Sequence, residues 1–236
     1  FLTAAAANVI QAFGTAEQKQ RFLPHMFSGR FSGTMALTEP NVGSSLGDLT
    51  TKAIPQADDQ YLIKGQTMFI SGGDQDITEN IVHLVLARIQ DAPQGVKGIS
   101  LFIVPKFRTH LDGTLAEAND VQLAGLLHKM GYRGTTSTVL NFGEQDACLG
   151  YLIGEAGSGL KYMFKMMNEA RVGVGLGAAM IGYRGYLESL EYAKQRPQGR
   201  LATEKNPNSK PVNIIEHTDV KRMLLAQKSY VEGSLA

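Results

Sequence analysis

The segments MALTEPNVGSS (residues 35–45) and GQTMFISGG (residues 65–73) carry the strongest signal in this chain. The first predicts a strand that runs into a turn of small and polar residues, whose backbone groups and hydroxyls can approach a planar polar ring and bond to its edge. The second predicts a strand with Phe69 two residues before Ser71. Because successive strand side chains point to opposite faces, these two share a face, which suits one side of a flat heterocycle. The residue types alone leave an ordinary hairpin equally open.

Short runs rich in β-branched and aromatic residues extend outward from these segments across residues 31–153. The runs are FSGTMALT, LTTKAI, QYLIKG, IVHLVLARI, GISLFIVP and STVLNF, separated by Gly, Pro, Asn and Asp. Strands spaced in this way, without helical patterns between them, predict an antiparallel sandwich or barrel instead of a parallel sheet. Residues 108–120 predict a polar loop or insertion.

Residues 1–29, before the strand-rich region, have a helical pattern. A new helix is expected after Gly14, because Thr15 and Gln18 have the spacing of a capping box. Pro24 is expected to bend or end that helix, since proline lacks the N–H that a helix interior needs.

A helical period returns at residues 157–195, after the strand-rich region. The glycines of its GVGLGAAMIGYRG stretch cost about 1 kcal/mol each relative to alanine, and a closely approaching neighbour helix is the expected compensation. Residues 197–212 predict a polar loop, and a last helix is expected from His217 or Thr218. The fold class is therefore α+β: an antiparallel β-sandwich or barrel domain flanked by helical segments.

Bulk properties exclude several classes of protein. The net charge of +1 gives no indication of nucleic acid binding or of an anionic membrane surface. The single Cys148 excludes an internal disulfide and fits a reducing compartment, so a cytoplasmic location is expected. No apolar run approaches the ~18 residues that a membrane span needs. The five histidines are scattered without metal-ligand spacing, so no metal site is predicted.

Several segments, in order along the chain, resemble the acyl-CoA dehydrogenase family of flavoproteins. LTEP followed by GS, and then G-x-x-x-[WF]-I-[ST]-x-G, resemble the two flavin-contacting segments of that family. FGTAEQKQRFLP (13–24) is similar to the stretch before its β-domain, HKMGYRGTTSTVLNF (128–142) to a later β-domain segment, and GEAGSGLKYMFKMMNEARVGVGLGAAMIG (154–182) to the start of its C-terminal helical domain. IVHLVLARI, GISLFIVPKF and IIEHTDVKRMLL are most similar to the longer bacterial branch that includes 3-methylthiopropionyl-CoA dehydrogenases.

The resemblance implies three parts: the end of an N-terminal helical domain (1–30), a β-domain that binds flavin and acyl-CoA (31–155), and the first helices of a truncated C-terminal helical domain (156–236). It implies FAD-dependent α,β-dehydrogenation of an acyl-CoA thioester, in which a carboxylate removes the α-proton and the β-hydrogen leaves as hydride. In most members the base is a Glu beyond the end of this chain. A minority place it at the position of Ala170, which cannot act as a base. Glu169 lies roughly 100° away around a helix, so the catalytic residue stays unassigned and this chain alone is expected to be inactive.

The resemblance also assigns site residues, position by position. The implied cofactor contacts are Met35, Leu37, Thr38, Gly43, Ser44, Phe69, Ser71 and Arg196. Ser44 and Arg171 are the implied substrate contacts. Phe69 takes the position where many members have Trp beside the ring, and Ser71 the position of a flavin-bonding Thr. Arg196 matches an Arg that reaches the FAD pyrophosphate of a neighbouring subunit, where bidentate guanidinium geometry suits phosphate.

The implied partners are acyl-CoA, an electron-transfer flavoprotein and further copies of the chain in a homodimer or homotetramer. Three alternatives stay open. An acyl-CoA oxidase has the same fold and passes electrons to oxygen. A flavin-bound, nucleic-acid-associated relative needs a basic face, against which the near-neutral charge argues. A scaffold protein without flavin is disfavoured by the intact LTEP and FIS segments.

Overall fold

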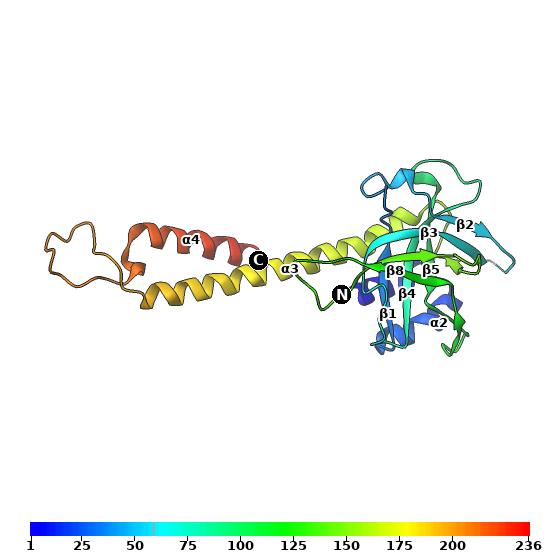
Figure 1. The fold of residues 1–236 in the computed structure, drawn as a ribbon, viewed down its shortest axis with the longest axis horizontal. Coiled ribbons are helices and arrows are strands. Elements are labelled where there is room, and N and C mark those ends of the chain that lie inside the picture. The colour runs from blue at the N-terminus through cyan, green and yellow to red at the C-terminus, as the bar shows by residue number, and fades with distance from the viewer. Residues whose placement is uncertain (59) are drawn as a thin grey trace. The chain divides into compact units, whose positions relative to one another are not determined.

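The computed structural model describes residues 1–58 and 60–236, which divide into two compact units, residues 1–170 and 171–236 (Figure 1). The first unit contains helices α1 (Leu2–Phe13) and α2 (Ala16–Phe27) and the described strands. The strands are β1 (Phe31–Ala36), β2 (Lys52–Pro55), β3 (Gln60–Ser71), β4 (Asn80–Ile89), β5 (Ile99–Pro105), β6 (Phe107–Thr109), β7 (Leu115–Ala118), β8 (Val121–Leu126), β9 (Ser137–Phe142) and β10 (Leu149–Leu152). Helix α3 (Gly159–Gln195) begins in the first unit and continues into the second, which also contains α4 (Thr218–Gly233).

The main sheet has the strand order β1-β4-β5-β10-β3-β9-β8. Strand β2 pairs with both β3 and β4, so β4, β5, β10, β3 and β2 form a closed ring. This confirms the expected barrel, with one difference. The pairs β1–β4 and β2–β4 are parallel, whereas the other pairs are antiparallel. The long connection between β1 and β4 permits the parallel pairing, because it is not limited to a tight hairpin.

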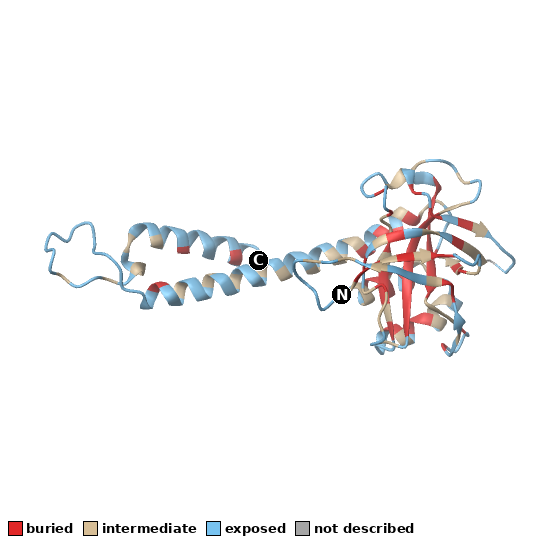
Figure 2. Ribbon diagram, viewed as in Figure 1, coloured by how far each residue is buried: buried red, intermediate tan, exposed pale blue. Residues whose placement is uncertain are grey.

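Two hydrophobic clusters lie on opposite faces of the barrel wall. Figure 2 shows many buried residues along the strands of the first unit. Along β4, Leu84 and Leu86 belong to the outer cluster, which packs against α1, α2 and the start of α3. Val85 and Ala87, the alternate residues, belong to the inner cluster that fills the barrel. Both faces of β4 are therefore buried, which explains why its sequence is an almost continuous apolar run.

Helix α2 begins as expected and ends later than expected. The hydroxyl of Thr15 accepts from the Gln18 N–H at 3.2 Å and the Gln18 side chain accepts from the Thr15 N–H at 3.0 Å, which confirms the capping box. The helix continues past Pro24 to Phe27. Buried side chains on both sides of the proline, including Met26, hold this turn against the outer cluster, and tertiary packing outweighs the lost hydrogen bond.

The expected loop at residues 108–120 instead contains most of the β6–β7 hairpin. Its turn lies at residues 110–114, where the Gly113 N–H donates to the His110 carbonyl at 2.9 Å and Gly113 has a φ of 79°. The Asp112 carboxylate accepts from the N–H and hydroxyl of Thr114, at 2.9 and 2.7 Å. Asp-Gly between two short strands is a hairpin signal.

The second unit contains the part of α3 from Arg171 onward, a polar loop and α4. Helix α3 begins two residues after the expected start at 157 and ends at the expected Gln195, and α4 begins at Thr218, one of the two expected starts. The expected close approach to a neighbouring helix is seen at Gly182, where an added Cβ would lie 3.3 Å from Val231 of α4. Gly175 and Gly177 have open space around them within the described chain. Among the described residues, none of the helices has the length and apolar character that crossing a membrane requires.

Candidate functional site

The turn after β1 is closed by its own backbone. Glu39 and Val42 exchange two hydrogen bonds, of 2.9 and 3.1 Å, which leave the tip of the turn in solvent. Thr38, before the turn, is half-buried, while Gly43 and Ser44, after it, are exposed. The turn therefore presents backbone groups and small hydroxyls at the surface of the first unit, as the residue types predict.

A β-bulge in β3 determines where Phe69 points. The pairing of β3 with β9 shifts register between Thr67 and Ile70, and Phe69 has a φ of 61°. Both Thr67 and Ile70 are buried, so simple alternation from Thr67 would direct Phe69 into the barrel. The bulge turns it outward, leaving it 60% exposed on the same side as exposed Ser71. The expected shared face is present, but the bulge produces it.

The two segments are directly connected. The Met68 N–H donates to the Thr38 carbonyl at 2.8 Å, which places the β1 turn beside the bulge. We call the surface formed by Leu37, Thr38, Gly43, Ser44, Phe69 and Ser71 the turn–bulge surface. Among the hydrogen bonds between described residues, none uses the hydroxyl of Thr38 or Ser71. The surface thus combines an exposed aromatic ring with hydroxyls whose bonding capacity is available to a ligand.

Three of the predicted site residues, Met35, Arg171 and Arg196, are not part of this surface. Met35 and Leu37 are half-buried, and their side chains pack on the outer cluster. Arg171 and Arg196 belong to the second unit, and their roles stay predictions. The carbonyl of Arg196 accepts from Ile214 N–H at 2.8 Å, where the polar loop returns to the end of α3. The side chain of Arg196 is exposed.

Glu39 is a central residue of the turn that sequence reasoning did not identify. It is only 4% exposed, and its carboxylate accepts hydrogen bonds from the N–H and the hydroxyl of both Thr50 and Thr51. Burial raises the pKa of the Glu39 carboxyl, but the bonds from the two threonines lower it more, so the net pKa is below the usual value. No local pattern signals this role, because an acidic residue in a turn is usually solvated.

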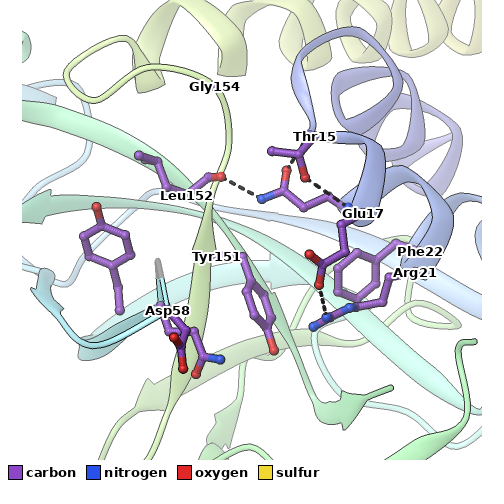
Figure 3. A pocket seen from close by; sticks show the side chains of 11 residues that line it. Thr15, Glu17, Arg21, Phe22, Asp58, Tyr151, Leu152 and Gly154 are labelled. Atoms are coloured by element: carbon purple, nitrogen blue, oxygen red, sulfur yellow. Dashed lines mark hydrogen bonds and ion pairs between the residues drawn. The ribbon is translucent and has the colours of Figure 1, made fainter. Parts of the chain in front are cut away.

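A separate cavity of about 500 Å³ lies between the start of α2, the β2–β3 turn and β10 (Figure 3). The Gln18 amide crosses to the Leu152 carbonyl at 2.8 Å, and the Arg21 guanidinium lies 5.1 Å from the centre of the Tyr151 ring. An ion pair with Glu17 occupies the same guanidinium. None of the predicted site residues lines this cavity, so we do not assign it to the turn–bulge surface.

Comparison with known proteins gives consistent matches. Residues 34–144 match the family model described as acyl-CoA dehydrogenase, middle domain. The whole chain aligns with a butyryl-CoA dehydrogenase of Syntrophomonas wolfei at 46% identity and with a 3-methylmercaptopropionyl-CoA dehydrogenase of Ruegeria pomeroyi at 43% identity. In both cases the alignment covers 100% of this chain and 39% of the relative, so the chain spans about two-fifths of the length of these proteins.

The fold is also similar to that of a solved butyryl-CoA dehydrogenase from Megasphaera elsdenii. The TM-score is 0.76 at 26% sequence identity, and the match covers 98% of this chain and 54% of that one. Sequence and fold agree on one assignment: residues 34–144 carry an acyl-CoA dehydrogenase middle domain, and the whole chain is similar to acyl-CoA dehydrogenases.

Proposed function

We propose that this chain is the flavin-facing part of an FAD-dependent oxidoreductase that catalyses α,β-dehydrogenation of an acyl-CoA thioester. The observation that carries this proposal is the hydrogen bond between Met68 and Thr38, which brings the two motif segments onto one surface. In this proposal the β-domain (31–155) binds flavin and acyl-CoA and lies between parts of two helical domains (1–30 and 156–236).

The turn–bulge surface fits the chemistry of a flavin. An isoalloxazine is flat and apolar on its faces and polar along one edge, so it needs an aromatic or aliphatic side wall and donors at the edge. Phe69 supplies the ring, and the hydroxyls of Thr38 and Ser71 supply donors that no hydrogen bond between described residues uses. When bound, FAD supplies the hydride acceptor, while the chain supplies position and hydrogen bonds.

Each predicted residue has a role in this proposal. Met35, Leu37 and Thr38 contact the isoalloxazine through backbone groups and, for Thr38, the hydroxyl. Phe69 flanks the ring and Ser71 hydrogen-bonds to it. Near the flavin phosphates and the CoA moiety lie Gly43 and Ser44. In the second unit, Arg171 contacts the substrate and Arg196 reaches the FAD pyrophosphate of a neighbouring subunit.

The proton-abstracting base is proposed to come from another segment of the full-length protein. Ala170 has no acidic group, and the Glu169 carboxylate accepts from the Asn8 side chain at 2.9 and 3.2 Å. This bond engages Glu169 with α1, so its position is explained by packing between helices of the first unit. An electron-transfer flavoprotein as acceptor, a homo-oligomeric state and a cytoplasmic location complete the proposal.

The test uses the full-length protein with FAD and with butyryl-CoA as probe substrate. We expect flavin absorbance in the purified protein and anaerobic reduction by the substrate, with turnover on an artificial acceptor. Phe69→Ala is expected to weaken FAD binding about three- to tenfold, as for the loss of one aromatic contact. Phe27→Ala is the matched control, because Phe27 is 62% exposed, against 60% for Phe69, and lies at the end of α2.

Three outcomes would change the assignment. A full-length protein that gains no flavin absorbance on incubation with FAD contradicts the proposal. Stoichiometric peroxide release under air would make it an oxidase. Salt-dependent DNA affinity of the flavin-bound protein would favour the nucleic-acid-associated alternative.

A further inference from the structure

The carboxylate of Glu39 is stabilised by hydrogen bonds alone. Thr50 donates its N–H at 3.0 Å and its hydroxyl at 2.7 Å, and Thr51 donates both groups at 2.7 Å. No cation contributes to the pKa of Glu39 within the described chain. Donors directed at two oxygens require a group that only accepts, which a carboxylate is and an amide is not. The site is therefore built for a glutamate.

This anchored carboxylate belongs to the turn that carries part of the turn–bulge surface. Glu39 directly follows Thr38, whose carbonyl accepts the Met68 N–H, and its backbone pairs with Val42. The side chain of Glu39 points away from the surface to residues that are eleven and twelve positions later in the chain. The two threonines thus connect the turn to the start of β2.

Gly65, the first glycine of the second motif, makes room for this connection. A Cβ at Gly65 would lie 2.4 Å from the Thr51 hydroxyl oxygen and 2.8 Å from the Thr51 Cβ. That hydroxyl is one of the donors to Glu39. Any side chain at Gly65 would displace Thr51 from the carboxylate. The glutamate of the first motif and the glycine of the second are therefore linked through one threonine.

We propose that Glu39 is a positioning residue for flavin binding. Through Thr50 and Thr51 it holds the turn of residues 38–44 against the bulge of β3. Position 65 is a glycine because Thr51 occupies the space that a side chain there would need. The inference rests on the proposed function, since it assigns a role in the same surface. Glu39 itself does not touch the ligand. Its effect on FAD is transmitted by the backbone that it fixes.

The test measures FAD affinity, the visible flavin spectrum and hydrogen exchange of residues 38–44 in the full-length protein. Glu39→Gln is expected to weaken FAD binding about tenfold or more, because the amide turns a donor toward the threonine donors. Gly65→Ala should have the same consequences, and the two substitutions together should weaken binding less than the product of their separate effects. Glu39→Asp, which keeps the charge on a shorter side chain, should restore part of the affinity.

Two matched controls make the same substitutions elsewhere. Glu79→Gln neutralises an exposed glutamate paired with Arg30, and Gly125→Ala adds a methyl group where no atom of the described residues lies within 4 Å. Both should leave the affinity, the spectrum and the exchange unchanged. If Glu39→Gln does not fold, Thr50→Val removes one hydroxyl donor at an exposed residue and should weaken FAD binding about threefold.

The outcomes separate this inference from the proposed function. The positioning role is wrong if the Glu39→Gln protein folds and has the FAD affinity, flavin spectrum and hydrogen exchange of the wild type; the proposed function then still stands. If Glu39→Gln does not fold, wild-type values for both Thr50→Val and Gly65→Ala overturn the positioning role instead. A wild-type protein that binds no FAD contradicts the proposed function. In that case, faster hydrogen exchange of residues 38–44 in the Glu39→Gln protein still supports the conclusion that Glu39 fixes the turn, and unchanged hydrogen exchange overturns it.

Discussion

The barrel unit (residues 1–170) and the helical unit (171–236) bury their apolar residues to very different extents. In the barrel unit, Phe102 and Phe142 are at most 2% exposed, and two clusters cover both faces of the wall. In the helical unit, large apolar residues such as Val172, Ile181 and Leu225 are 65% exposed or more (Figure 2). Burial provides most of the free energy that maintains a fold.

This contrast decides which functional statements each unit supports. The turn–bulge surface is supported by a closed barrel, so the relative positions of Thr38 and Phe69 follow from a packed core. Arg171 lies on α3 and Arg196 directly follows the end of that helix, in a unit whose large apolar residues are mostly exposed in the described chain. Exposed apolar surface of this kind marks a contact with another segment or chain. Their roles therefore depend on the surroundings in the full-length protein.

The largest expected effect is the difference between the two units in how much stability is lost when one apolar side chain is removed. Phe102→Ala should destabilise the barrel unit by about 3–5 kcal/mol, because it empties a fully buried site beside the Tyr61 ring. Leu225→Ala, at a site that is 65% exposed, should change stability by about 0.5 kcal/mol or less. Hydrogen exchange of the 236-residue protein resolves the units separately. Equal effects of the two substitutions would mean that the second unit has a core of its own.

A smaller effect depends on pH and belongs to the barrel interior. His83 is fully buried, with Nδ1 2.7 Å from the Thr34 hydroxyl oxygen, and burial lowers its pKa from 6.5 to about 3, with Asp74 opposing and Lys106 adding to the shift. Below pH 6.5 the unfolded chain therefore binds a proton that the folded chain binds only near pH 3. Stability is full above pH 6.5 and falls as the pH decreases from there, by about 2 kcal/mol at pH 5.

The comparison that isolates His83 is urea unfolding at pH 7.5 and pH 5. The double substitution Thr34→Val and His83→Leu removes both hydrogen-bonding partners. It should abolish most of the decrease in the free energy of unfolding between pH 7.5 and pH 5, which we call the acid loss. His128→Gln, at an exposed position, should leave the acid loss unchanged. An acid loss that persists in the double variant would locate the sensitivity elsewhere.

The sequence predicts the parts of the fold whose signals are local. The capping box at Thr15 and the apolar run of β4 are visible in adjacent residues, and both are confirmed. Strand β10 was missed because a four-residue strand with glycine inside it has no periodicity to recognise. The bulge at Phe69 and the anchoring of Glu39 depend on residues from other strands and loops, so no local pattern contains them. Resemblance to the family was enough to predict the site residues. The contacts that bring these residues together could be identified only from the structure.

The smallest expected effect compares one substitution at two positions of the same helix, α3. At Gly159, in the barrel unit, an added Cβ would lie 2.3 to 2.7 Å from backbone atoms of Ser100 and Leu101, which cannot move without disturbing β5. Gly159→Ala should therefore destabilise the 236-residue protein by at least about 1 kcal/mol. At Gly175, in the helical unit, no neighbouring atom of the described residues lies within 4 Å of an added Cβ, so Gly175→Ala should stabilise the helix by up to about 1 kcal/mol through propensity alone. Thermal unfolding and helix exchange rates measure both changes. If Gly175→Ala is destabilising in the full-length protein and stabilising in the 236-residue chain, another helix packs against that glycine in the longer protein, because only a close neighbour can reverse the sign.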